Sequence, residues 1–176
     1  MDYYQIKQVT LASAIAVVCT LPVAATVDAA IYLKFEGIDG ESKDNAHKDE
    51  IDVLSWSWGM SSDSKDKKGP CIEDLLLTKY VDSATPGFVQ SAANSDQPVN
   101  AVLTVDRAGE PTFVLEFSGI GVKEIHSSQN HTDDRPVEEV AFYYNKVDGT
   151  YQRPVDSDGT RYEPQSFVVI PGKCKP

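Results

Sequence analysis

The sequence predicts a mainly β protein, a barrel or sandwich of antiparallel strands with one short α-helix. Apolar and polar residues alternate in several short segments, which is the period of a strand with one buried face. Residues that favour turns separate these segments, and only one stretch has the pattern of a helix. About seven or eight short strands joined by turns are typical of a barrel or a sandwich.

The first half of the chain contains three segments with a strand pattern: residues 31–35, 51–58 and 75–80. In the second of them Leu54, Trp56 and Trp58 share one face, which we expect to face the core, with at least one indole largely buried. A loop with many charged residues and no apolar anchor follows at residues 61–70. We expect that loop to be mobile.

One helix is predicted after the third strand. Thr85 is a candidate N-cap, Pro86 suits the first helical position, and Phe88 lies on an apolar stripe. The pattern ends near Asn94, so the helix should be short.

The second half of the chain contains four further strand patterns: residues 99–105, 113–117, 137–147 and 167–170. Gly119 and Gly121 lie where the alternation slips, which indicates a bulge or sharp coiling. Asp148-Gly149 predicts a two-residue hairpin turn between Val147 and Thr150, and residues 157–159 predict another turn.

The N-terminus has the layout of a cleavable export signal. A short polar start with Lys7 precedes an apolar run at residues 9–21, and small residues follow. The run is shorter than the ~20 residues of a membrane span. We therefore expect residues 1–25 to be a signal peptide, with cleavage as late as residue 30, followed by one domain at residues 31–176. A buried N-terminal helix and a lasting membrane anchor are the alternatives.

The formal net charge of the chain is −11, and removal of Asp2 with Lys7 leaves it unchanged. Such an acidic protein repels phosphate backbones and anionic lipid surfaces. The charge thus argues against nucleic acid as a partner and against membrane binding after signal removal. We expect a secreted or periplasmic protein, with an extracellular location possible.

Three cysteines are present, and Cys19 lies in the predicted signal. Cys71 and Cys174 remain, an even pair in a chain destined for an oxidising compartment. A disulfide between them and two unlinked thiols are both compatible with the sequence.

No set of residues in the sequence makes a convincing site, so we predict no catalytic, cofactor-binding or metal-binding residue. His126 and His131 lie near Asp133 and Asp134 but match no ligand spacing, so a solvated loop is expected there. Residues 156–159 resemble a fragment of a calcium loop without its later carboxylate, and are interpreted as a turn. A dense carboxylate run is interpreted as a solvated charged loop: Asp39, Glu41, Asp44, Asp49 and Glu50.

Several of these segments together resemble a known family. Residues 40–44 and 50–59 resemble the start of the haemolysin-coregulated protein (Hcp) family, which forms the tube of type VI secretion systems. Residues 77–86, Leu-Thr-Lys-Tyr-Val-Asp-Ser-Ala-Thr-Pro, resemble that family's F-T-K-Y-x-D-x-x-T-P segment. Residues 103–109 are similar to the strand after its helix, and residues 138–140 to a late strand.

The resemblance implies a β-barrel of two packed antiparallel sheets flanked by one short helix. It also implies hexameric rings that stack into a tube, with small cargo proteins in the lumen, a spike protein at the tip and no enzymatic activity. A cleavable signal is not part of that role, because the tube protein is loaded in the cytoplasm. A monomeric periplasmic or extracellular binding module therefore stays open as an alternative, and a small hydrolase ranks last because no nucleophile and base pair can be named.

Overall fold

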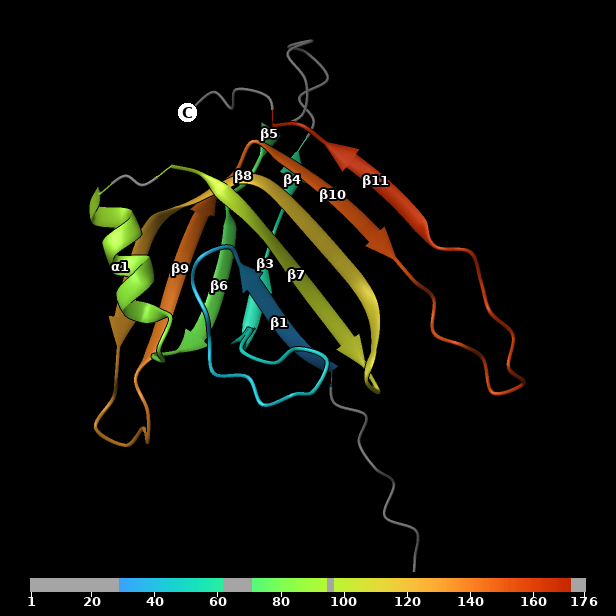
Figure 1. Cartoon of the computed structure of the whole chain (residues 1–176), viewed down its shortest axis with the longest axis horizontal. Coiled ribbons are helices and arrows are strands. Elements are labelled where there is room, and N and C mark those ends of the chain that lie inside the picture. The colour runs from blue at the N-terminus through green and yellow to red at the C-terminus, as the bar shows by residue number, and fades with distance from the viewer. Residues whose placement is uncertain (1–28, 62–70, 95–96, 172–176) are drawn as a thin grey trace, which may run out of the picture.

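The computed structural model describes residues 29–61, 71–94 and 97–171 of the chain. In these ranges it contains eleven strands and one helix, and every strand pairing is antiparallel (Figure 1). In chain order the elements are β1 (Ala29–Phe35), β2 (Ile51–Asp52), β3 (Ser55–Ser57), β4 (Met60–Ser61), β5 (Cys71–Ile72), β6 (Leu75–Tyr80), α1 (Thr85–Asn94), β7 (Val99–Arg107), β8 (Glu110–Ser128), β9 (Val137–Tyr143), β10 (Lys146–Tyr151) and β11 (Gln165–Val169).

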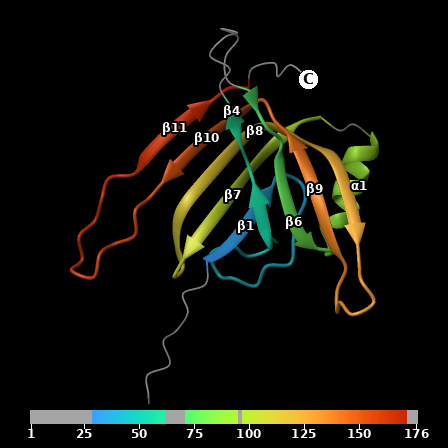
Figure 2. The same ribbon diagram turned by 180° about the vertical axis from the view of Figure 1, so that it is seen from behind.

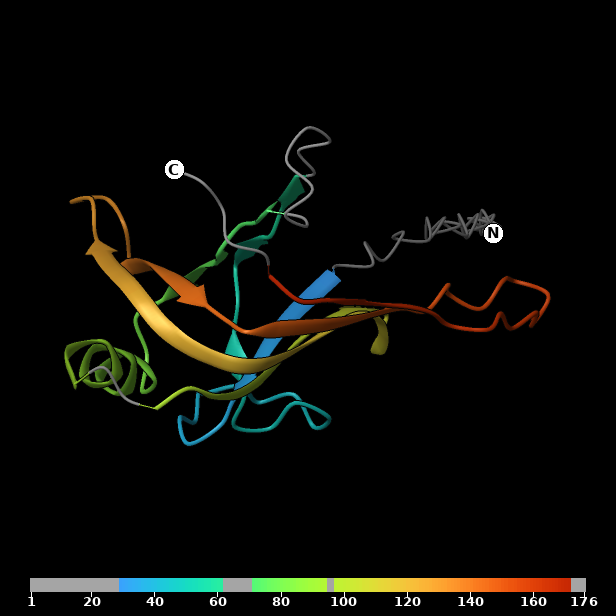
Figure 3. The ribbon, with the colours of Figure 1, turned by 90° about the horizontal axis from the view of Figure 1, so that it is seen from above.

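The 19-residue strand β8 organises the fold. Its first half pairs with β7 on one side and with β10 on the other, and its second half pairs with β9. The strands follow the order β2-β1-β7-β8-β9-β6-β3, with β10 and β11 branching from β8, while β4 and β5 pair separately. Figure 3 shows β8 curving along its length, which carries the chain from one half of the sheet to the other.

Strand β8 is irregular at Gly119, one of the two glycines that the sequence marks, because Val99 of β7 pairs with Ile120 and Asn100 pairs with Ser118. Gly119 has a φ of 66°, a backbone conformation that L side chains rarely adopt. The register between β8 and β9 shifts between Val122 and Glu124. The predicted bulge is therefore confirmed.

The described strands confirm a mainly antiparallel β fold with one short helix. Hydrogen bonding within the described ranges does not close them into a barrel, because β2, β3 and β11 each have a single partner strand. These three strands are the edges of the sheet.

The predicted hairpin at Asp148-Gly149 is wrong. Strand β10 runs straight through both residues, and β9 and β10 follow one another in the same direction along β8, joined through Tyr144 and Asn145. A Cβ on Gly149 would come within 2.1 Å of the Phe167 ring on β11. The glycine is thus explained by close approach of a neighbouring aromatic side chain rather than by a turn.

The single strand predicted at residues 51–58 is also corrected. The backbone N–H of Val53 donates to Ile31 in β1, whereas that of Leu54 donates to Thr78 in β6. The chain therefore crosses from one part of the sheet to another between these two residues. The crossing interrupts the alternation of buried and exposed side chains, so Leu54 is 47% exposed instead of lying on the core face.

Both indoles pack against the core, although neither is fully buried. Trp56 and Trp58 are both partly buried against the core, stacked on Phe113 and Phe167 respectively. Phe113 and Phe167 lie in strands that are far from the two tryptophans in the sequence, so no local pattern predicts these contacts.

The helix is confirmed over Thr85–Asn94 and covers one end of the core (Figures 1 and 2). Its fully buried Phe88 meets Phe35 and Phe142 edge to face, with ring centroids 5.4 Å apart in both pairs. Such aromatic contacts add to the apolar area that the helix buries.

Candidate functional site

Buried charge is concentrated where β6, β9 and α1 meet. Lys79 in β6 and Glu138 in β9 have no exposed side-chain surface, and Lys79 Nζ lies 2.9 Å from Glu138 Oε1. The same Nζ donates to Asp82 Oδ1 at 2.6 Å and to the Tyr80 carbonyl at 2.7 Å. All three ammonium protons of Lys79 are therefore used, which is how a buried cation is tolerated.

This buried ion cluster also fixes the start of α1. The Thr85 hydroxyl donates to Glu138 Oε1 at 2.9 Å and accepts from the Asp82 backbone N–H. Asp82 Oδ1 accepts from the backbone N–H of Ala84 at 2.9 Å. Asp82, rather than the predicted Thr85, thus supplies the side-chain acceptor at the helix entry. All three partners of the Lys79 ammonium belong to this cluster, whereas Glu138 Oε2 is buried without a hydrogen-bond partner.

The alternation of side chains along two strands indicates this cluster, although the amino-acid composition does not. Lys79 lies on the same buried face of β6 as Leu75 and Leu77. Glu138 has the same phase as Val140 and Phe142 in β9. A lysine and a glutamate on the buried faces of two strands predict an ion pair, provided that the strands are neighbours.

A second cluster, the histidine clamp, holds the loop after β1 against β7. His47 Nδ1 lies 2.8 Å from Glu50 Oε2, and His47 Nε2 lies 3.2 Å from Asp106 Oδ2. The imidazole also stacks on Tyr32, with centroids 4.1 Å apart. The loop is thus anchored through a buried histidine, so the prediction of a wholly solvated carboxylate run is wrong for Glu50.

The clamp lies in a negative environment. Burial raises the pKa of Tyr32, and the charges of Asp44, Asp52, Asp106 and Glu50 add to that rise. Burial alone lowers the pKa of His47, but the hydrogen bonds and charges of Glu50 and Asp106 outweigh it, so the pKa of the imidazole is raised. A protonated imidazole donates from both nitrogens, which suits the two carboxylates it faces.

The clamp should make stability depend on pH. Because the folded-state pKa of His47 is above the unfolded value of about 6.5, its contribution is complete below about pH 6.5 and is lost as pH rises through the folded-state pKa. We expect His47→Gln to lower the free energy of unfolding by about 1–3 kcal/mol at pH 6, and by less at pH 9. Urea denaturation at both values measures the difference.

The matched control is His126→Gln. His126 Nε2 also contacts a glutamate, Glu124, but this pair is exposed on β8 and should contribute little. An equal loss for both variants, or a His47→Gln loss that does not change with pH, would contradict the clamp.

The other candidates from the sequence lie apart. His126 is on β8, and His131 is exposed in the following turn. Within the described ranges, no group of three or more His, Cys, Asp or Glu residues is placed to hold a metal ion. Residues 156–159 form the predicted turn, in which Asp156 accepts from the Tyr162 hydroxyl at 2.6 Å. Cys71 is disulfide-bonded.

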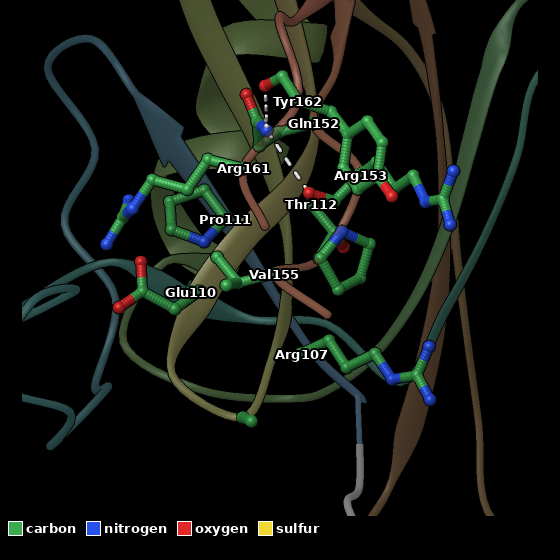
Figure 4. Close-up of a pocket in the computed structure, with 11 residues that line it drawn as sticks. Arg107, Glu110, Pro111, Thr112, Gln152, Arg153, Val155, Arg161 and Tyr162 are labelled. Atoms are coloured by element: carbon green, nitrogen blue, oxygen red, sulfur yellow. Dashed lines mark hydrogen bonds between the residues drawn. The ribbon is translucent and has the colours of Figure 1, made fainter. Parts of the chain in front are cut away.

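A hollow of ≈ 470 Å³ lies between the β7–β8 turn and the loop from β10 to β11 (Figure 4). We call it the arginine hollow, because its rim carries Arg107, Arg153 and Arg161. Apolar wall residues come from both segments and include Pro111 and Val155. Its volume is in the range of ligand pockets, and sequence analysis did not predict it.

The loop that forms one wall of the hollow is braced by its own hydrogen bonds. The backbone N–H of Gln152 donates to the Thr112 carbonyl, and its side-chain amide donates to the carbonyls of Arg153 and Tyr162. The Arg153 guanidinium lies over the Tyr162 ring, 3.9 Å from its centroid. The hollow is therefore preformed.

Comparisons with known proteins agree on one family. The family described as "Type VI secretion system effector, Hcp" matches residues 32–151. Protein hcp1 of Pseudomonas aeruginosa is 34% identical over 143 residues, covering 74% of this chain and 87% of that protein. The chain thus resembles a curated protein over most of both lengths.

Solved structures show the same fold. A type VI secretion system effector from Yersinia pestis superposes with a TM-score of 0.68 at 24% identity, covering 80% of this chain and 98% of that one. Hcp1 from Salmonella typhimurium gives a TM-score of 0.62 at 30% identity, with coverages of 70% and 88%. No helix among the described residues is long and apolar enough to cross a membrane.

Proposed function

The chain belongs to the Hcp family of type VI secretion systems, and we propose that it is an exported structural protein that assembles into hexameric rings without catalytic chemistry of its own. The observation that carries the proposal is the family match from β1 to the end of β10, residues 32–151. In this proposal the two halves of the sheet form a barrel wall. The rings carry small protein cargo in the lumen and meet a spike protein at one end.

Two features support export through a signal at residues 1–25. The disulfide at Cys71 is a bond that persists in oxidising compartments and is rare in the cytoplasm. Strand β1 begins at Ala29, which pairs with Arg107 in β7. Cleavage after Ala25 leaves this pairing intact, whereas cleavage after Ala30 removes two of its residues. We therefore propose Thr26 as the first residue of the processed protein.

The processed protein should form rings of about six copies, with a mass about six times that of the monomer. Light scattering at micromolar concentration and at two ionic strengths measures this mass. Because each chain carries a net charge of −11, salt should screen the long-range repulsion and favour the ring.

Mass spectrometry of the same material from its host gives the N-terminus. A strict monomer at both ionic strengths would contradict the ring and favour the monomeric binding module. An intact Met1 in the soluble fraction would contradict the cleavable signal.

A further inference from the structure

We propose that the arginine hollow receives the acidic loop, residues 39–50, of a second copy of this chain within the ring. The inference rests on the proposed ring and names one of its contacts. It assigns to the hollow an acidic polypeptide segment rather than a small anion.

Charge distribution is the first argument. The chain has four arginines, and three of them lie on the rim of the hollow. The fourth, Arg135, lies elsewhere, with its guanidinium 4.5 Å from the centroid of the Tyr80 ring. The lining also holds one carboxylate, Glu110, so in a chain of net charge −11 the hollow is a locally positive site that another acidic copy can approach.

The availability of the arginines is the second argument. Arg153 is held by the Tyr162 ring and by Asp156. Arg107 and Arg161 take part in no ion pair within the described ranges, and Figure 4 shows them extending to different sides of the hollow. A small anion cannot bridge two guanidinium groups that diverge, whereas a chain segment with spaced carboxylates can reach both.

The acidic loop has the complementary chemistry. It contains five carboxylates against two lysines, and Asp39, Glu41, Asp44 and Asp49 are exposed. Its backbone is already ordered, because the N–H of Gly40 donates to Asp49 at 2.8 Å and the N–H of Ser42 donates to Glu50 at 3.0 Å. A preformed segment loses little conformational entropy when it docks.

The arrangement in space indicates neighbours within one ring. The acidic loop and the β7–β8 turn lie at the same end of the sheet, and the β10–β11 loop projects away from the body at that side (Figure 1). Two surfaces at the same end of the molecule meet more readily when copies lie side by side than when copies stack end to end. Two different patches that meet in this way form a heterologous contact, the type that generates closed rings.

Part of the hollow lies beyond the residues that match the family. The family match ends at residue 151, whereas Arg153, Val155, Arg161 and Tyr162 lie beyond it. Val155 is 48% exposed, so a docked segment would cover apolar surface as well as pair charges.

The first test is charge reversal on the processed protein. We expect R107E/R161E to raise the dissociation constant of the ring about tenfold or more, since two exposed ion pairs become repulsive. R135E is the matched control and should leave the ring intact, because Arg135 lies outside the hollow. Analytical ultracentrifugation over a dilution series measures both, and circular dichroism checks that each variant is folded.

The second test identifies the partner surface. R107K/R161K keeps the charges and supplies amines that a carbodiimide couples to carboxylates in contact with them. Peptide mass spectrometry on mixed isotope-labelled and unlabelled protein should find links from position 107 or 161 to residues 39–50 of another copy. Links confined to one copy, or to acidic residues elsewhere, would overturn the assignment.

The outcomes separate this inference from the proposed function. A wild-type ring that R107E/R161E leaves unchanged overturns the contact and leaves the ring standing. A monomeric wild type overturns both. A small-anion site would instead show as a rise in melting temperature with millimolar phosphate or citrate that R107E/R161E abolishes, together with an intact ring, and that result also overturns the inference.

Discussion

Replacing Lys79 with methionine should lower the free energy of unfolding by about 3–5 kcal/mol, a large part of the stability of a domain this size. The substitution removes the cation and leaves the carboxylates of Glu138 and Asp82 buried, with exposed side-chain fractions of 0% and 7%. An uncompensated buried charge is among the most destabilising changes that a fold can undergo. Urea denaturation at neutral pH measures the loss.

Lys123→Met is the matched control. Lys123 also pairs with a carboxylate, Asp74, but this pair is largely exposed, so its loss should cost at most about 1 kcal/mol. Adding Glu138→Leu to Lys79→Met should recover part of the loss, because one of the two buried carboxylates is then removed and Asp82 alone lacks its cation. Similar small losses for both lysine variants would show that the buried cluster does not stabilise the fold.

The buried ion cluster also gives a physical reason for the segment on which the family resemblance rested. Lys79, Asp82 and Thr85 all come from residues 77–86, and each of them contacts Glu138 or a group that contacts it. The segment joins β6 to α1 and sets where the helix begins. Its residue types are therefore required by a buried hydrogen-bonding network, and no catalytic role is needed to explain them.

Local patterns predicted much of the fold. The strands at β1, β6 and β7 and the helix α1 lie where alternation and helix signals placed them. The failures concern contacts between distant segments. The local sequence around Gly149 predicts a turn. The residue that explains the missing side chain is Phe167, which lies 18 positions later and is not visible in the local pattern. The alternation at residues 51–58 predicts one continuous strand, whereas the two halves of this segment pair with different strands, β1 and β6.

The candidate sites follow the same rule. His47 and Asp106 are 59 positions apart, and so are Lys79 and Glu138. No local pattern pairs them, since strand order decides which buried faces meet. The arginine hollow joins the β7–β8 turn to a loop that follows β10, and its two parts become neighbours only because β10 pairs with β8.

The disulfide at Cys71 should contribute about 2–4 kcal/mol to stability in the processed protein. The other cysteines, Cys19 and Cys174, lie outside the described residues. Cys19 belongs to the predicted signal, so processing leaves Cys174 as the available partner in the same chain. A bridge between Cys71 and Cys174 would close a loop of about 100 residues, and long loops restrict the unfolded chain most in the entropic account.

Cys174→Ser should therefore lower the urea midpoint of the processed protein under oxidising conditions and have no effect once a reductant is present. Reduction of the wild type should bring its midpoint down to that of the variant, because both then lack the cross-link. Cys19→Ser is the control, and it should leave the processed protein unchanged because the proposed cleavage removes the residue. Thiol labelling in denaturant counts the unlinked cysteines directly. Two reactive thiols in the wild type, or equal midpoints for wild type and Cys174→Ser without reductant, would contradict the bridge and remove one of the two supports for export.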